Sequence, residues 1–263
     1  MGSHKIHDVK VIFTEPDDIR LVIVKVETND PDLYGVGCAT FTQRPTSVAA
    51  AINDCLRPFL IGKNPDDIED IWQSSYVSSY WRNGPVLNNA LSGIDQALWD
   101  IKGKLAGMPV YDLIGGKARS SAGVYVHANG NNPEEVERNV RKFISEGYHH
   151  VRVQVATPGY SSYSNSSVRT KPESTGGGSG PRIGTDRLFE PTTDKLHAHP
   201  GGIFEPVPYM QSVVNLFEHL RSTVGWDVEL IHDVHERIPP INGVGLAKDL
   251  EKFKLFFLED LFS

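Results

Sequence analysis

The sequence predicts an α+β domain followed by a parallel (β/α) fold. In the first part of the chain, strand patterns come first and helix patterns follow them. From about residue 119 onward, short apolar strands alternate with helices in the order βαβαβαβ, which is typical of a parallel sheet with crossover helices. We therefore predict two domains, residues 1–118 and 119–263, with a long loop insertion at about residues 157–208.

The first domain begins with three predicted antiparallel strands. They cover residues 6–13, 21–26 and 34–40, and β-branched residues are frequent in them. Turn sequences separate the strands, Glu15-Pro16-Asp17-Asp18 and Asn29-Asp30-Pro31-Asp32. A meander of this size needs a second layer to pack against, so the helices that follow are expected to cover it.

Three main helices are predicted in the rest of this domain. The first, residues 46–56, is alanine-rich and is expected to end before Pro58. The second is expected to start at Asn64-Pro65, with the asparagine as N-cap and the proline in the first helical position. The strongest spans residues 86–105, where apolar side chains recur with the 3.6-residue helical period, and Gly107 ends it.

Four strands and three helices are predicted in the second domain. A strand at residues 123–128 leads to a helix that begins at Asn132-Pro133 and ends at Gly147, and the next strand covers residues 150–155. After the insertion the pattern gives a helix, a strand, a helix and a strand, at residues 210–223, 228–233, 246–253 and 255–259.

The composition favours a globular enzyme and excludes several other classes. The net charge of -7 argues against a nucleic-acid-binding protein. No run approaches the length of a membrane span, and the N-terminus lacks the apolar core of a signal peptide. The two cysteines, Cys38 and Cys55, form no CxxC motif, which is typical of a protein in the reducing cytosol. We therefore expect a cytoplasmic protein.

The insertion is rich in serine and glycine and poor in apolar residues. It contains the stretch Gly176-Gly177-Gly178-Ser179-Gly180, but no GxxxxGK[ST] motif, so a phosphate-binding loop is not expected. A loop this long inside a compact domain is usually functional or mobile. We expect it to cover an active site.

Two strands of the second domain end in carboxylates, Asp233 and Glu259. Because the carboxyl ends of parallel strands meet at one edge of the sheet, both acids are expected in one site there. Their carboxylates are oxygen ligands suited to Mg²⁺. His235 follows two residues after the first acid and is placed to act beside the metal. Either acid alone is explained equally well as a loop cap, whereas both together with a histidine favour a site. His232 should face the helix layer and is assigned no role.

Several sequence segments together resemble the enolase superfamily. They are the helix segment from Leu87 to Gly116, His127-Ala128-Asn129-Gly130, Arg152-Val153-Gln154 and Asp233-Val234-His235. The resemblance covers nearly the whole chain and is greatest to the mannonate dehydratase-like sugar-acid dehydratases. It implies that the first domain is an N-terminal capping domain and the second the first half of an enolase-like TIM barrel.

The resemblance also implies a metal site. Asp233 and Glu259 match the first two of three Mg²⁺ ligands, at the ends of the third and fourth barrel strands. His235 matches the general acid that helps a β-hydroxyl leave, and His127 matches a residue that contacts the substrate.

A base is implied at a second position. Arg152 lies where many relatives carry a Lys-x-Lys base, and in this subgroup an arginine pairs with a loop tyrosine that takes the proton. Tyr163 is the first candidate for that tyrosine and Tyr160 the alternative. A nearby cation is needed because a phenol is a poor base at neutral pH.

These parts imply Mg²⁺-dependent dehydration of a hexonate of the D-mannonate or D-gluconate class to a 2-keto-3-deoxy sugar acid. The alternative is a catalytically weak or inactive paralogue with a regulatory or starvation-related role. Racemisation is a third possibility, which Arg152-Val153-Gln154 disfavours because it lacks the lysine pair. The expected partners are a small-molecule sugar acid and further copies of the chain in a homo-oligomer.

Each candidate residue also has a purely structural explanation. Arg152 is equally explained as a barrel residue paired with an acid, and Tyr163, among serines, as a surface tyrosine. His127 is equally explained as a satisfied polar residue at a strand end. His149 and His150, at a strand start, are expected to be surface residues.

The chain departs from the resemblance at two places. Thr42 stands where relatives that dehydrate mannonate well carry an asparagine, so mannonate itself is in question as the substrate. The sequence also stops at Ser263, before the third metal ligand and the last four βα units. A half barrel would expose a parallel sheet edge, so we expect these residues to be part of a longer polypeptide.

Overall fold

The computed structural model describes residues 4–16, 19–156, 183–184 and 205–262. The chain divides into two compact units. The first unit contains the residues up to 120 together with the short strand β6 (Ile183–Gly184), and the second begins at residue 121.

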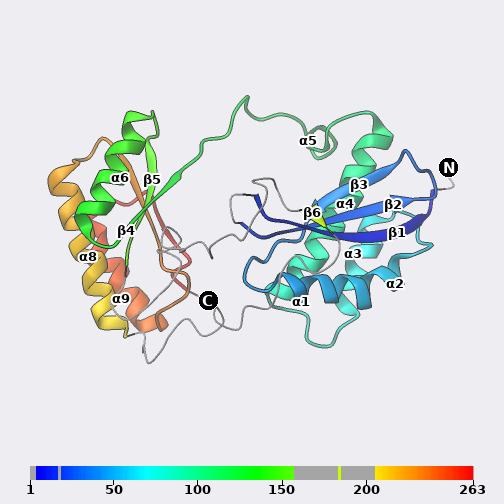
Figure 1. The fold of residues 1–263 in the computed structure, drawn as a ribbon, viewed down its shortest axis with the longest axis horizontal. Coiled ribbons are helices and arrows are strands. Elements are labelled where there is room, and N and C mark those ends of the chain that lie inside the picture. The colour runs from blue at the N-terminus through cyan, green and yellow to red at the C-terminus, as the bar shows by residue number, and fades with distance from the viewer. Residues whose placement is uncertain (1–3, 17–18, 157–182, 185–204, 263) are drawn as a thin grey trace, which may run out of the picture. The chain divides into compact units, whose positions relative to one another are not determined.

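The first unit is built on an antiparallel sheet of three long strands. They are β1 (Ile6–Thr14), β2 (Leu21–Thr28) and β3 (Tyr34–Cys38), and β6 pairs with the outer side of β1. Along β2 the side chains alternate between buried and partly buried positions, which is the pattern of a sheet with one face in the core. The three predicted strands are confirmed in order and direction (Figure 1).

The first helical segment passes through a proline that we expected to end it. It consists of α1 (Pro45–Ala50), a π-helical turn (Ala51–Leu56) and α2 (Arg57–Leu60). At the end of the π-helical turn, the Arg57 N–H donates to the Ile52 carbonyl, five residues back. This wider turn accommodates Pro58, which has no N–H to donate. The prediction of a stop before Pro58 was therefore wrong.

The second helix, α3 (Ile68–Val77), begins later than predicted. Asp67 occupies the N-cap position. Asn64 instead makes a turn, since its Oδ1 accepts from the Asp66 N–H at 3.2 Å. Asn and Pro favour turns as well as helix starts, and here the turn is formed.

The longest helix, α4 (Pro85–Ala106), packs against β3 and ends as predicted at Gly107, which has a φ of +66°. Glycine permits an unusually close approach between this helix and the sheet. A Cβ atom on Gly35 would lie 1.9 Å from the carbonyl oxygen of Ala97. The short helix α5 (Val110–Leu113) follows. The core between sheet and helices is made by the buried apolar residues of β1, β2, α1, α3 and α4.

The second unit contains a four-stranded parallel sheet. Its strands are β4 (Val126–Gly130), β5 (His150–Val155), β7 (Glu229–Asp233) and β8 (Phe257–Glu259), in that order across the sheet. All three pairings are parallel, so the predicted βαβαβαβ arrangement is confirmed. β4 begins three residues later than predicted.

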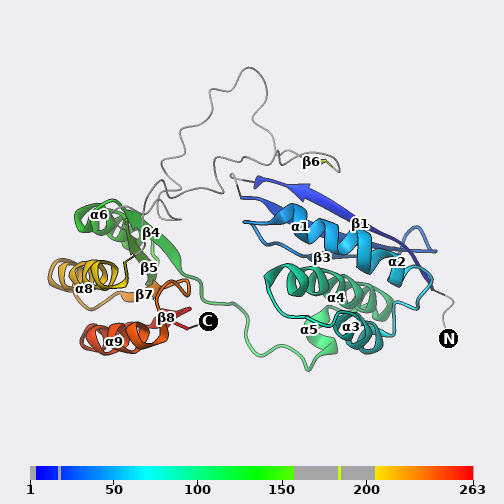
Figure 2. The ribbon, with the colours of Figure 1, turned by 90° about the horizontal axis from the view of Figure 1, so that it is seen from below.

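Three helices lie on one side of this sheet (Figure 2). They are α6 (Pro133–Ser145), α8 (Pro206–Thr223) and α9 (Pro240–Leu250). The predicted N-cap of α6 is confirmed, because the Oδ1 of Asn132 accepts from the Glu135 N–H at 2.9 Å. α9 begins six residues before the predicted start, and the predicted last turn is a 3₁₀ helix (Glu251–Phe253).

Apolar residues fill most of the space between this sheet and its helices. No helix in the described part of the chain is both long enough and apolar enough to cross a membrane.

Candidate active site

The two strand-end acids are brought together at one edge of the parallel sheet. Asp233 is the last residue of β7 and Glu259 the last of β8, and the two are direct partners in the β7–β8 register. Asp233 is buried, with 3% of its surface exposed, whereas Glu259 is partly exposed. The carboxyl ends of these strands therefore present one buried and one accessible carboxylate.

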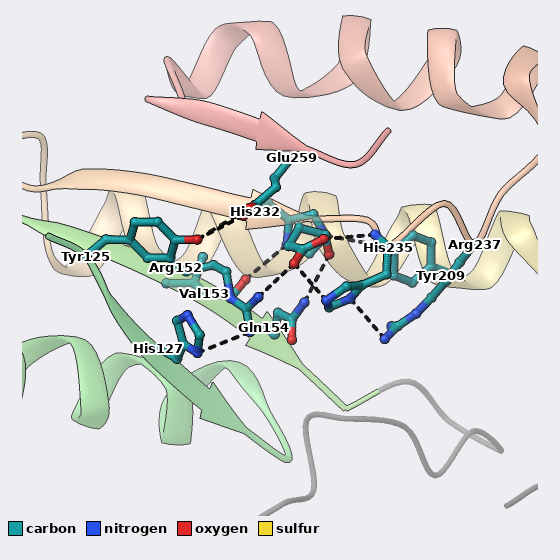
Figure 3. Close-up of polar contacts among 11 residues, drawn as sticks. Tyr125, His127, Arg152, Val153, Gln154, Tyr209, His232, His235, Arg237 and Glu259 are labelled. Atoms are coloured by element: carbon teal, nitrogen blue, oxygen red, sulfur yellow. Dashed lines mark hydrogen bonds and ion pairs between the residues drawn. The ribbon is translucent and has the colours of Figure 1, made fainter. Parts of the chain in front are cut away.

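Three donors converge on the buried carboxylate (Figure 3). The Nη1 of Arg152 and the Nε2 of His235 each lie 2.7 Å from Oδ2 of Asp233. The backbone N–H of His235 donates to Oδ1 at 2.9 Å. Burial by itself raises the pKa of Asp233, but the hydrogen bonds from His235 and the charge of Arg152 outweigh it, so the pKa is lowered. Asp233 is therefore a carboxylate at neutral pH.

The loop after β7 holds the histidine in an unusual backbone conformation. His235 and Glu236 have φ angles of +55° and +54°, and Asp260, after β8, has a φ of +46°. The two strand ends support each other, since the Val234 N–H donates to Glu259 and the Glu236 N–H to Asp260. Such left-handed backbone in residues other than glycine collects at functional sites.

Arg237 fixes the orientation of the His235 ring. Its Nη2 lies 3.1 Å from Nδ1 of His235. A guanidinium only donates hydrogen bonds, so Nδ1 accepts and the ring proton is on Nε2, which faces Asp233. Arg237 was not among the site residues predicted from the sequence. Its position two residues after the histidine was the available signal.

Arg152 connects the acid to a further histidine. Its Nη2 lies 3.4 Å from Nδ1 of His127, and the two residues are register partners on β4 and β5. Burial, and then the charge of Arg152, lower the pKa of His127. The Nε of Arg152 is buried and has no partner among the described residues. The guanidinium therefore has a buried donor, the Nε–H, that no described residue accepts.

Tyr125 contacts the more exposed acid. Its hydroxyl lies 3.3 and 3.4 Å from the two carboxylate oxygens of Glu259. Its ring is tilted against His127, with 5.6 Å between the ring centres. Tyr125 was not among the predicted site residues either, although its spacing from His127 places both on one face of an extended chain.

A side chain of the neighbouring strand β5 fixes the backbone of Asp233. The Nε2 of Gln154 donates to its carbonyl oxygen at 3.0 Å. The neighbouring His232 is 2% exposed and lies between the Tyr209 hydroxyl, at 2.9 Å, and the Val153 carbonyl, at 3.0 Å. Burial lowers the pKa of His232 to about 4. Its contact with α8 confirms the expectation that His232 faces the helix layer.

The donor set at this edge fits part of a divalent cation site. Asp233 and Glu259 supply carboxylate oxygens, which Mg²⁺ prefers, from directly paired positions. In the described part of the chain, no group of three or more His, Cys, Asp or Glu side chains is placed to hold a metal ion. These two acids are therefore a partial ligand set.

Two candidate residues cannot be placed. Tyr163 and its alternative Tyr160 lie outside the described residues. The five other candidates, His127, Arg152, Asp233, His235 and Glu259, lie together in the second unit.

Comparisons with known proteins agree with the architecture. Residues 3–115 match the N-terminal domain of the mandelate racemase / muconate lactonizing enzyme family. D-galactonate dehydratase family members of Salmonella virchow and Pantoea ananatis are 49% and 51% identical over 260 residues. Each match covers 99% of this chain but only 60% of the relative, so the chain spans about three fifths of the length of these curated relatives.

Solved structures give the same result. An enolase from Pantoea ananatis with bound D-gluconate and Mg is 48% identical, with a TM-score of 0.78, over 99% of this chain and 60% of that one. A putative dehydratase from Zymomonas mobilis ZM4 is 26% identical, with a TM-score of 0.72, over 99% of this chain and 62% of that one. The predicted architecture, a capping domain and the first half of a barrel, is thereby confirmed. The names of these relatives support neither the narrower mannonate assignment nor a catalytically weak paralogue.

Proposed function

Because this chain belongs to the enolase superfamily, we propose that its strand-end site takes part in the dehydration of a hexonate to a 2-keto-3-deoxy sugar acid. One observation carries the proposal. Asp233 and Glu259 are register partners at the strand ends. Asp233 is also hydrogen-bonded to the guanidinium of Arg152 and the imidazole of His235. This combination offers metal ligands, a fixed cation and a proton donor in one place.

Asp233 and Glu259 are the residues that would hold Mg²⁺, with a third ligand still to be identified. When bound, the ion would stabilise negative charge that develops on the substrate carboxylate as its α-proton leaves. The dehydratase names of the relatives, and the Mg²⁺ and D-gluconate in the Pantoea ananatis enolase, support this proposal.

The proton at the α-carbon would be taken by a tyrosine beside Arg152. Tyr163 is our first candidate and Tyr160 the alternative. The buried Nε of Arg152, which has no partner among the described residues, supports such a role. A tyrosinate oxygen would accept this donor, and the neighbouring positive charge would favour the ionised phenol.

His235 would deliver a proton to the departing β-hydroxyl from its imidazolium form, which would leave the neutral ring. Its Nε2 faces Asp233, and Arg237 lies against the opposite ring nitrogen. Loss of the α-proton and of the protonated hydroxyl amounts to loss of one water, which leaves an enol that tautomerises to the 2-keto acid. His127, beside Arg152, would contact the substrate.

Product formation by the full-length protein tests the proposal. With Mg²⁺ and a panel of D-gluconate, D-mannonate and D-galactonate, we expect release of a 2-keto-3-deoxy acid, measured as its semicarbazone. D-gluconate is the preferred candidate because it is the acid bound to the related enolase. Asp233→Asn should abolish product, whereas Asp227→Asn, the same change at an exposed residue before β7, should not. No product from any hexonate would refute the enzymatic proposal.

A further inference from the structure

A separate cavity of about 320 Å³ lies entirely within the first unit. Its wall is formed by residues of the π-helical turn, the end of α3, the segment that follows α3 and the first half of α4. None of the strand-end site residues contributes to it. Its volume is at the lower end of the range for small-ligand sites, and about twice that of a cavity known to hold benzene.

The wall is mainly apolar, with one buried hydroxyl. Leu56, Leu87 and Leu91 are among its apolar residues. Ser75 also lines the cavity and is 7% exposed, and its Oγ has no hydrogen-bond partner among the residues that the structure describes. Buried polar groups nearly always have a partner, so an unpaired hydroxyl in a cavity wall indicates a ligand that would provide one.

The wall carries a single charge, which is positive. Arg82 is its only charged residue; its side chain is exposed and forms no ion pair with a described residue. Its guanidinium lies over the ring of Tyr76, 5.1 Å from the ring centre, and the Tyr76 hydroxyl donates to Asn83 at 3.1 Å. An arginine held beside an apolar cavity without a carboxylate partner favours an anionic ligand.

The backbone beside the cavity is also irregular. Ala51, Cys55 and Leu56 belong to the π-helical turn and contribute to the wall. Single π-helical turns inside α-helices are rare and occur frequently at functional sites. This π-helical turn, which also accommodates Pro58, therefore forms part of the cavity wall.

We propose that this cavity binds a small hydroxylated aromatic monocarboxylate. The apolar wall would contact the ring, Arg82 would pair with the carboxylate, and Ser75 would bond to the ring hydroxyl. A sugar acid fits this wall less well than an aromatic acid, because the wall is mainly apolar and many hydroxyls would lose their hydrogen bonds to water. The cavity is thus a second ligand site, distinct from the site proposed for dehydration.

Calorimetric titration of the protein with 4-hydroxybenzoate tests the proposal, with benzoate and 4-hydroxybenzyl alcohol as matched probes. We expect a dissociation constant of roughly 1 mM or lower for 4-hydroxybenzoate. Arg82→Gln should weaken its binding about tenfold. Arg138→Gln, the same change on the exposed face of α6, should have no effect. Ser75→Ala should weaken the binding of 4-hydroxybenzoate but leave the binding of benzoate unchanged.

Cysteine labelling locates the bound acid. In a Cys38→Ser background, Cys55 is the one remaining thiol of residues 1–263 and lies in the cavity wall. Bound 4-hydroxybenzoate should slow its alkylation by iodoacetamide, and Leu87→Trp, which fills the rim, should remove that protection.

Three outcomes would overturn the proposal. The first is that 4-hydroxybenzoate, at a concentration roughly ten times the expected dissociation constant, gives no binding heat and does not slow the alkylation of Cys55. The second is binding that is indifferent to Arg82→Gln and Leu87→Trp. The third is absence of binding together with a change of oligomeric state in Leu87→Trp, which would identify the cavity as a contact between copies of the chain.

Discussion

Arg152 and Asp233 form the most buried ion pair among the described residues. The Nη1–Oδ2 distance is 2.7 Å, and the two side chains are 12% and 5% exposed. The same oxygen also accepts the Nε2–H of His235. A charge in such a position is tolerated only when it is paired and hydrogen-bonded. The stability of this strand end and the geometry proposed for catalysis therefore depend on the same contacts.

Replacing Arg152 by methionine should destabilise the protein. The change leaves Asp233 buried without its guanidinium partner, and breaking a buried pair on one side costs about 3 kcal/mol. Urea denaturation at pH 7 measures this loss. Lys142→Met removes an exposed cation whose nearest acid oxygen, on Glu146, is 3.9 Å away, and it should cost less than about 0.5 kcal/mol. If the two substitutions lowered the free energy of unfolding equally, the buried pair would contribute no more to stability than the exposed one.

His232 should make stability depend on pH between about 4 and 6.5. Burial lowers its pKa to about 4 in the folded state from an ordinary value of 6.5. The unfolded chain therefore binds the proton more readily in this window, and the stability contributed by neutral His232 is lost as the pH falls through it. Between pH 7 and pH 5 the loss due to this residue should be about 2 kcal/mol.

The comparison of wild type with His232→Gln isolates this effect. Glutamine keeps a donor and an acceptor but does not titrate in this range. Urea denaturation at several pH values should give a smaller slope for the variant. His149→Gln, which removes an exposed imidazole, serves as the control. An identical pH dependence of wild type and His232→Gln would contradict the assignment of His232 as a buried neutral base.

Gly35→Ala should disrupt the packing of β3 on α4. The added Cβ would meet the Ala97 carbonyl oxygen at 1.9 Å, and backbone atoms in a packed helix cannot move aside easily. We expect a loss of about 3 kcal/mol in the free energy of unfolding. Gly123→Ala is the matched control, because a Cβ there meets nothing within 4 Å. If both variants unfolded at the same urea concentration, the close approach of strand and helix would be disproved.

The order and type of the elements followed from local patterns. Period-2 and period-3.6 repeats predicted the antiparallel strands, α4 and the alternating units, because each element buries one face. The errors lie where two local preferences compete. Asn64 and Pro65 favour a turn as well as a helix start, and the π-helical turn that admits Pro58 has no sequence signal we could use.

The location of the candidate site could be predicted from the sequence, but several of its side-chain contacts could not. Asp233 and Glu259 could be placed together because parallel strands share an edge. The contact of Tyr125 with Glu259, 134 residues away in sequence, depends on how the sheet curves. The contact of Arg237 with His235 depends on the left-handed backbone of the loop. Local sequence preference determines neither feature.

Tyr163→Phe should stop exchange of the substrate α-proton with solvent if Tyr163 is the base. The proposal needs a phenolic oxygen near the donor that Arg152 leaves unused, and phenylalanine keeps the ring while removing that oxygen. Incubation of the full-length variant with Mg²⁺ and D-gluconate in D₂O, followed by proton NMR, measures exchange independently of hydroxide loss. Tyr160→Phe is the matched control and should exchange at the wild-type rate. Mg²⁺ binding, measured by calorimetry, should be the same in both variants, because neither tyrosine is a proposed ligand. Normal exchange in Tyr163→Phe with loss in Tyr160→Phe would transfer the role to Tyr160, and normal exchange in both would exclude this pair as the source of the base.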